Sequence, residues 1–243
     1  MQVVIDNTLI TYTDEGNGEI LLCVHGWMDD HTSYKQLAAE LKDRFRIISL
    51  DLPNFGNSQL TEKIITIDDY AHFISLFIEK LQLKSYKLVG HSMGCQIAIY
   101  AIGNGYINPD KVVLLAPAGV RNNLKIKKTV LKRVSKMLRN FVPNKYKKKF
   151  YLAIGSDYNP NLSVIHKKII SETLSTDIQN QAKKIYIPTL IINGSSDADT
   201  PVWMANTLHT KIRNSEIRIV ANVGHRVHED AAKLVASYIK KFA

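Results

Sequence analysis

The stretch that decides the fold of this chain is Lys87-Leu-Val-Gly-His-Ser-Met-Gly-Cys95. The apolar run from Tyr86 to Val89 predicts a buried strand, and residues 96–101 predict a helix. Between them, Gly90-His-Ser-Met-Gly94 matches the G-x-S-x-G pattern, in which a nucleophilic serine stands on a tight strand-to-helix turn. Glycines two residues before and after Ser92 remove side chains that would collide in such a turn. We therefore expect the Ser92 hydroxyl to be presented at the positive N-terminal end of a helix.

The length and composition of the chain indicate one large α/β domain. Its 243 residues are enough for a sizeable core, and 45% of them are hydrophobic. No apolar run approaches the roughly 18 residues that a membrane span needs. The first residues, Met1 to Asp6, lack the basic and apolar regions of a signal peptide. The two cysteines, Cys23 and Cys95, make no disulfide framework, so we expect a reduced, cytoplasmic protein.

Short apolar runs alternate with helical patterns along the chain. The expected strands, which begin with a hairpin, cover residues 3–5, 9–13, 20–24, 46–50, 86–89, 112–116, 187–193 and 216–220. Helices are expected over residues 33–41, 70–81, 96–101, 203–212 and 226–242, and Thr66-Ile-Asp-Asp69 resembles the N-cap of the second of these. This alternation predicts a mostly parallel sheet covered by helices on both faces. In such sheets the reactive groups gather at the carboxyl ends of the strands.

Positive charge is concentrated in residues 121–184, which we call the basic segment. It carries 16 Lys and Arg against 3 Asp and Glu, a net charge of +13, whereas the whole chain has +10. Apolar stripes predict three helices here, near residues 130–141, 146–154 and 164–174. We expect the basic segment to form a helical cap above the carboxyl edge of the sheet, and residues 1–120 and 185–243 to form the core.

The excess charge of the basic segment has two interpretations. Lysine side chains on a helix commonly do no more than face water. A strong local field would also suit an acidic partner, such as a carrier protein, an ester that bears phosphate or carboxylate, or an anionic lipid surface. Nucleic acid is not expected, because the aromatic residues do not interleave with the charges.

Three further features follow predicted strands and would meet Ser92 at the same edge of the sheet. Asp197 lies in Asn193-Gly-Ser-Ser-Asp-Ala-Asp-Thr-Pro201, and His225 ends Asn222-Val-Gly-His225. The chain order Ser92, Asp197, His225 is the order that this topology requires for a nucleophile, an acid and a base. His225 would take the serine proton, and Asp197 would hold the imidazole tautomer. In the third feature, His25-Gly-Trp27, the backbone N–H of Trp27 would join that of Met93 in binding an oxyanion.

These ordered elements, together with Asp51-Leu-Pro-Asn-Phe-Gly-Asn-Ser58, resemble the α/β-hydrolase family, in the branch with a helical cap. The resemblance covers nearly the whole chain. It implies a mostly parallel eight-stranded sheet with helices on both faces and the cap inserted after strand six. Carried over by position, it implies Ser92 as nucleophile, Asp197 as acid and His225 as base, with Trp27 and Met93 as oxyanion donors. Serine at position 92 argues against the family's aspartate-dependent dehalogenases and epoxide hydrolases.

Several polar residues near these motifs have alternative roles. Asp199 competes with Asp197 as the acid, although the spacing of Asp197 from Gly194 and Pro201 fits the family better. His25, Gly26 and His91 are candidate substrate-binding residues, and His91 equally suits a packing role. His228 is expected on the last helix as a surface or cap-facing group.

No metal site and no cofactor are expected from the sequence. The remaining histidines, at positions 31, 72, 166 and 209, show no metal-ligand spacing with a cysteine or a carboxylate.

The leading hypothesis is a serine hydrolase that cleaves a small carboxylic ester through an acyl-enzyme. His25-Gly-Trp27 and the basic segment are similar to esterases that demethylate a pimeloyl-carrier-protein methyl ester. Carbon–carbon bond hydrolases of the meta-cleavage type share the same triad and cap, so they are the alternative enzyme class. A slow-turnover ligand receptor on the same fold is the non-enzyme alternative.

Overall fold

The computed structural model describes residues 1–121 and 162–243. The first two helices expected in the basic segment, and most of its positive charge, lie outside these residues. The described part of the basic segment forms α6 (Val164–Ile169), a π-helical turn η3 (Ile170–Leu174) and α7 (Gln179–Ala182). None of the helices in the described ranges is long and apolar enough to cross a membrane.

Eight strands form one sheet in the order β1-β2-β4-β3-β5-β6-β7-β8. The strands are β1 (Gln2–Ile5), β2 (Thr8–Glu15), β3 (Glu19–Val24), β4 (Phe45–Leu50), β5 (Lys87–His91), β6 (Lys111–Leu115), β7 (Thr189–Gly194) and β8 (Ser215–Val220). The first two pairings, β1 with β2 and β2 with β4, are antiparallel, and all the others are parallel. The predicted eight-stranded, mostly parallel sheet is therefore confirmed.

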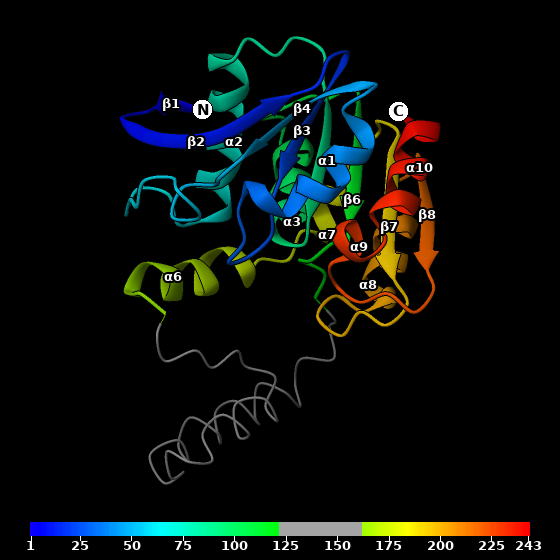
Figure 1. Cartoon of the computed structure of the whole chain (residues 1–243). Coiled ribbons are helices and arrows are strands. Elements are labelled where there is room, and N and C mark those ends of the chain that lie inside the picture. Colours follow the sequence, from blue (N-terminus) through cyan, green and yellow to red (C-terminus); the bar gives the residue numbers. More distant parts are fainter. Residues whose placement is uncertain (122–161) are drawn as a thin grey trace, which may run out of the picture.

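Alternating side chains of the central strands divide the core into two layers. On β3, Leu22 and Val24 pack into one apolar cluster, while Leu21 and Cys23 pack into the other. The first layer is covered by α2 (Ile67–Lys80), α3 (Met93–Gly103) and α8 (Val202–Lys211), and the second by α1 (Lys35–Leu41) and α10 (Ala232–Phe242). Figure 1 shows helices on both sides of the sheet, as the sequence predicts.

Local signals set the ends of several elements. Thr66 caps α2 with a reciprocal pair of hydrogen bonds to Asp69, which confirms the predicted N-cap. The prediction of a single last helix over residues 226–242 is wrong. The segment is divided into α9 (Val227–Asp230) and α10, because Ala231 has a non-helical backbone at φ −130°, ψ 34°.

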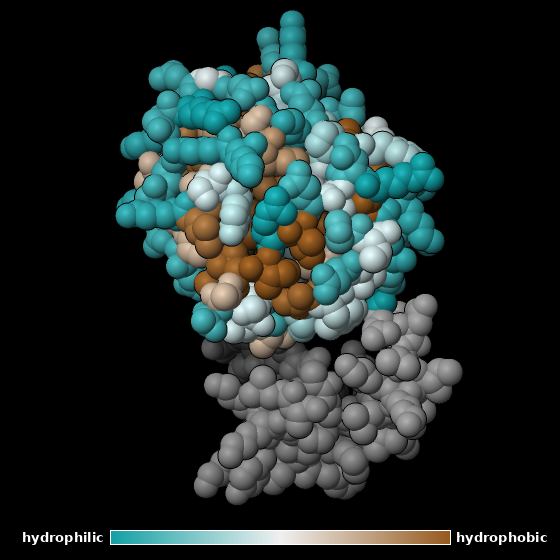
Figure 2. All heavy atoms as spheres, turned by 90° about the vertical axis from the view of Figure 1, so that its right-hand side faces the viewer, coloured by the Kyte–Doolittle hydropathy of each residue, from teal (hydrophilic) through white to brown (hydrophobic). Residues whose placement is uncertain are grey.

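The outer strand β8 closes one side of the sheet beside α8 and α10. Figure 2 faces this side and shows an apolar patch bordered by polar side chains. Large exposed hydrophobic residues on these elements include Trp203, Ile219 and Leu234. Charged side chains also lie on the strand, where Arg218 pairs with Glu216, as is common at an edge strand.

Candidate active site

Ser92 stands between β5 and α3 in a strained backbone conformation. Its φ is 50° and its ψ is −111°, a region that residues other than glycine rarely adopt. The turn needs its glycines: a Cβ on Gly90 would lie 2.8 Å from the Cys95 nitrogen, and one on Gly94 would lie 2.1 Å from the Val24 oxygen. The Ser92 amide donates to Leu115 O at 3.0 Å, which ties the turn to β6. This geometry agrees with the strand–turn–helix predicted from the sequence.

Asp197 and His225 meet beyond the ends of β7 and β8. His225 Nδ1 lies 2.9 Å from Asp197 Oδ2. Asp197 is 6% exposed, and its carboxylate also accepts hydrogen bonds from the Thr200 hydroxyl at 2.7 Å and from the Thr200 amide at 2.9 Å. Burial raises the pKa of Asp197, but the hydrogen bonds from His225 and Thr200 outweigh it and leave the pKa below its ordinary value. The carboxylate is therefore ionised at neutral pH and holds the Nδ1–H tautomer of the imidazole.

The alternative acid, Asp199, has a different environment. Its side chain is exposed, and its backbone N–H donates to Asp197 Oδ1 at 2.9 Å. Asp199 thus supports the Asp197 carboxylate through its main chain.

Thr200 is a residue of this site that the sequence reasoning missed. Its hydroxyl lies 2.7 Å from Asp197 Oδ2, 3.2 Å from His225 Nδ1 and 3.1 Å from Ala116 O. The spacing Asp197-x-x-Thr200 is typical of a local side-chain turn and would have been the signal. Thr200 links the acid, the histidine and the loop after β6.

Of the predicted oxyanion donors, Trp27 lies on the loop after β3, and Met93 directly follows Ser92 as the first residue of α3. Neither the Trp27 nor the Met93 amide has a hydrogen-bond acceptor within residues 1–121 and 162–243. Gly26 lets the first loop approach, because a Cβ there would lie 3.2 Å from Ser92 Cβ. In the same described ranges the Ser92 hydroxyl makes no hydrogen bond, so its pairing with His225 stays a prediction. Such contacts are often loose until substrate binds.

His25 supports the loop that carries Trp27. It is fully buried, its Nδ1–H donates to Gly26 O at 2.7 Å, and its Nε2 accepts the Leu52 amide at 2.9 Å. Burial lowers its pKa, so the ring is neutral. Both ring nitrogens are therefore used by the backbone, which leaves none for a substrate.

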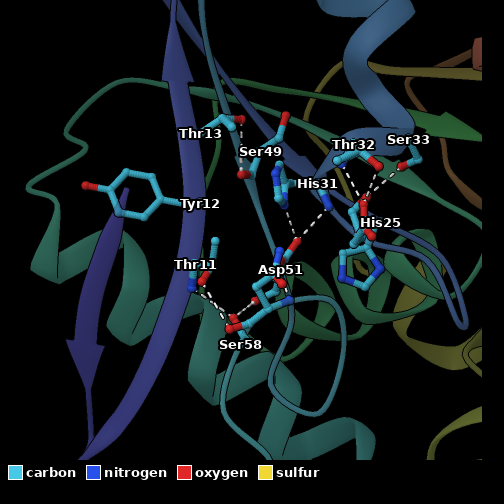
Figure 3. A network of polar contacts seen from close by, with 12 residues as sticks. Thr11, Tyr12, Thr13, His25, His31, Thr32, Ser33, Ser49, Asp51 and Ser58 are labelled. Carbon is cyan, nitrogen blue, oxygen red and sulfur yellow. Dashed lines mark hydrogen bonds and ion pairs between the residues drawn. The ribbon is translucent and has the colours of Figure 1, made fainter.

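A second network of polar contacts, drawn in Figure 3, holds the loop after β4. Asp51 accepts from the backbone N–H of His31 at 2.7 Å, and its Oδ1 lies 2.6 Å from His31 Nδ1. Ser58 Oγ donates to Asp51 O at 2.8 Å. These contacts fix the loop that carries Phe55.

An aromatic cluster joins this loop to α6. The ring centroids of Trp27 and Phe55 are 5.4 Å apart, and that of His166 lies 5.7 Å from Trp27. His166 Nε2 also donates to Asn54 O at 2.9 Å. The role of His166 in connecting the basic segment to the core was missed, because nothing local in the sequence marks that contact.

Two more histidines lie behind the site. His91 is 3% exposed, and its Nε2 lies 3.1 Å from His225 O. The prediction that His228 lies on the surface or faces the cap is wrong. His228 is fully buried, with its ring centroid 4.2 Å from His91 and 5.2 Å from Tyr34, because α9 packs against η1 (His31–Tyr34) and α1. Burial lowers the pKa of His228 to about 4 and holds that of His91 well below its ordinary value.

Comparison with known proteins agrees with this fold. The chain is 30% identical to the uncharacterized hydrolase YugF of Bacillus subtilis, over 92% of this chain and 89% of that protein. It is 23% identical to a putative esterase/lipase 2 of Mycoplasma genitalium, over 97% and 93% of the two chains. The structure of an esterase from Thermogutta terrifontis superposes with a TM-score of 0.74 at 21% identity, over 99% of this chain and 96% of that one. A sequence profile described as the alpha/beta hydrolase family matches residues 21–237, and the chain belongs to this family of hydrolases.

Proposed function

We propose that this hydrolase cleaves carboxylic esters through an acyl-enzyme on Ser92. The observation that carries the proposal is the pair of buried Asp197 and part-exposed His225, with Oδ2 and Nδ1 2.9 Å apart, at the same sheet edge as a serine held at φ 50°. An ionised carboxylate that fixes the imidazole tautomer leaves Nε2 as the free base that a serine nucleophile needs.

In the proposed reaction, Ser92 Oγ attacks the ester carbonyl carbon while His225 Nε2 takes the hydroxyl proton. The backbone N–H groups of Trp27 and Met93 would stabilise the negative oxygen of the tetrahedral intermediate, and one such donor is worth on the order of 10²–10³ in turnover. The C–O bond then breaks and His225 gives its proton to the departing alkoxide. Water, deprotonated by His225, attacks the acyl-enzyme, which releases the acid and restores Ser92.

The test is a series of p-nitrophenyl esters from acetyl to palmitoyl, with wild type beside Ser92→Ala. We expect the wild type to hydrolyse at least one chain length and the variant to lose at least about 10³-fold in kcat. Labelling by a fluorophosphonate, read by mass spectrometry at Ser92, reports the nucleophile independently of the ester chosen. Equal hydrolysis by both proteins, or labelling elsewhere, would contradict the proposal.

The alternative enzyme classes are outcomes of the same experiment. A chain that is labelled at Ser92 yet hydrolyses none of the esters would direct the search to a vinylogous diketone, the substrate type of a carbon–carbon bond hydrolase, or to a carrier-protein methyl ester. Very slow turnover with ligand-dependent partner binding would favour the receptor.

A further inference from the structure

Asp29, His91 and His228 bring three metal-ligand side chains together behind the candidate active site. One possible ligand atom from each lies within 4.8 Å of those of the other two. They come from the loop after β3, the end of β5 and the short helix α9. We call them the buried histidine cluster. The proposed ester chemistry uses none of its three side chains to move a proton.

The cluster contains buried polar atoms that nothing in the described part of the chain satisfies. Within those residues His91 Nδ1 and both ring nitrogens of His228 have no hydrogen-bond partner, and Asp29 Oδ2 has only an ion pair at 3.5 Å with Arg226 Nη1. The His228 side chain is fully buried, and that of Asp29 is 12% exposed. Buried polar groups in native proteins nearly always have a partner, which points to a bound species between these side chains.

The protonation state of His91 suits a metal ligand. A carbonyl oxygen can only accept, so His91 Nε2, which lies 3.1 Å from His225 O, must carry the proton. The lone pair on Nδ1 is therefore free. Histidines that bind a metal usually donate their other ring N–H to a carbonyl or a carboxylate in this way. Burial also keeps both cluster histidines neutral, the form that binds a metal.

The surroundings supply negative charge for a cation. Gly26 packs closely against the His91 ring, because a Cβ there would lie 2.8 Å from His91 Nδ1. Arg226 is the competing cation, with Nη1 3.5 Å from Asp29 Oδ2, but it also pairs with Glu229. Two carboxylates thus share one guanidinium, and one negative charge remains.

We propose that Asp29, His91 and His228 form a binding site for a divalent transition-metal ion of the Zn²⁺ type. Two imidazoles with one carboxylate favour such ions over Mg²⁺ and Ca²⁺, which prefer oxygen ligands. Bonds of about 2.0–2.1 Å require ligand atoms about 3.3 Å apart, so ligand atoms that lie within 4.8 Å of one another must approach by up to about 1.5 Å around the ion. The ion would join the loop that carries Trp27 to the segment that carries His225.

The experiment titrates the chelator-treated full chain with Zn²⁺ by calorimetry and with Co²⁺ by visible absorption. Wild type is compared with Asp29→Asn, with His228→Leu and with the matched control His72→Asn, whose histidine is exposed on α2. We expect one ion per chain and a rise in Tm for wild type and control, and at least a tenfold loss of affinity in the two cluster variants. These readouts do not depend on ester hydrolysis, so this inference and the proposed function can fail separately.

Two results would overturn the site. A wild-type chain that binds neither ion would assign the buried atoms to an ordered water. Binding that survives both Asp29→Asn and His228→Leu would place the ion elsewhere on the chain. If His228→Leu fails to fold, Asp29→Asn carries the same test, because it removes the charge and keeps the shape.

Discussion

The Asp197–His225 pair and the buried histidine cluster are both built from aspartate and histidine side chains, and they meet where His91 Nε2 lies 3.1 Å from His225 O. In the first region the carboxylate is satisfied by His225, Thr200 and a backbone amide, and the imidazole side chain is 21% exposed. In the second region the ring nitrogens of His228 and Nδ1 of His91 have no hydrogen-bond partner in the described part of the chain. The difference separates a carboxylate–imidazole pair whose buried acid is satisfied by its neighbours from a cluster whose buried ring nitrogens have no partner in the described residues.

The largest expected effect is the loss of kcat when the Asp197–His225 pair is disrupted. Asp197→Asn keeps the shape but replaces an oxygen that accepts from His225 Nδ1–H by an amide group that can donate. The imidazole is then no longer held with its proton on Nδ1, so kcat for a p-nitrophenyl ester should fall by about 10³–10⁴. Asp199→Asn is the matched control and should lose little, because Asp199 supports Asp197 through its backbone N–H. A loss in Asp199→Asn as large as in Asp197→Asn would transfer the role of the acid to Asp199.

The next effect is on the free energy of unfolding as a function of pH, measured by urea unfolding of the chelator-treated protein. In the folded chain burial lowers the pKa of His228 from 6.5 to about 4, so the unfolded chain binds the extra proton between these values. Stability is therefore full above about pH 6.5 and is lost as the pH falls toward 4, by about 3 kcal/mol from this residue. His228→Leu should remove this part of the slope and leave the part that buried His25 and His91 contribute, and an unchanged slope would contradict the burial argument.

Asp197 should lose its stabilising effect in a lower pH range than His228. Its pKa lies below the ordinary value, so its stabilising effect is present at pH values above the ordinary carboxyl pKa and is lost only as the pH falls through the lower folded value. The slope between pH 6.5 and 4 should consequently be the same in Asp197→Asn as in wild type.

A smaller effect sharpens the description of the first region. Thr200→Val removes the hydroxyl that donates to Asp197 Oδ2 and keeps the shape of the side chain. A hydrogen bond to a charged group is worth about 1.5 kcal/mol, so kcat should fall about tenfold. Thr207→Val on α8, where the hydroxyl bonds to its own helix, is the control and should retain wild-type kcat. No loss in Thr200→Val would show that Asp197 is held without this hydroxyl.

The smallest effect concerns the buried histidine cluster without metal at pH 7.5. Replacing a buried imidazole that has no partner by an apolar side chain removes an unsatisfied group, so His228→Leu should leave the free energy of unfolding unchanged or raise it by about 1 kcal/mol. Urea unfolding measures this difference. A loss of more than about 2 kcal/mol would mean that the ring makes a stabilising contact in the metal-free protein.

Local sequence signals predicted the elements that position Ser92 and the candidate acid and base. The turn at Gly90-His-Ser-Met-Gly94 follows from glycine spacing between an apolar run and a helix, and these features act over a few residues. The cap of α2 at Thr66 is equally local. The break at Ala231 and the inward direction of His228 were not predictable, because they depend on the packing of α9 against η1 and α1.

The sequence alone therefore determined the fold class, the family resemblance and the order of Ser92, Asp197 and His225, since each depends on patterns within short segments. Only the tertiary structure decided which polar atoms meet. Thr200 lies against His225, His166 joins the loop after β4, and Asp29, His91 and His228 converge from three elements distant in the chain. The physical reason is that hydrogen bonds and metal ligation depend on distances in space, which the spacing of residues along the chain does not specify.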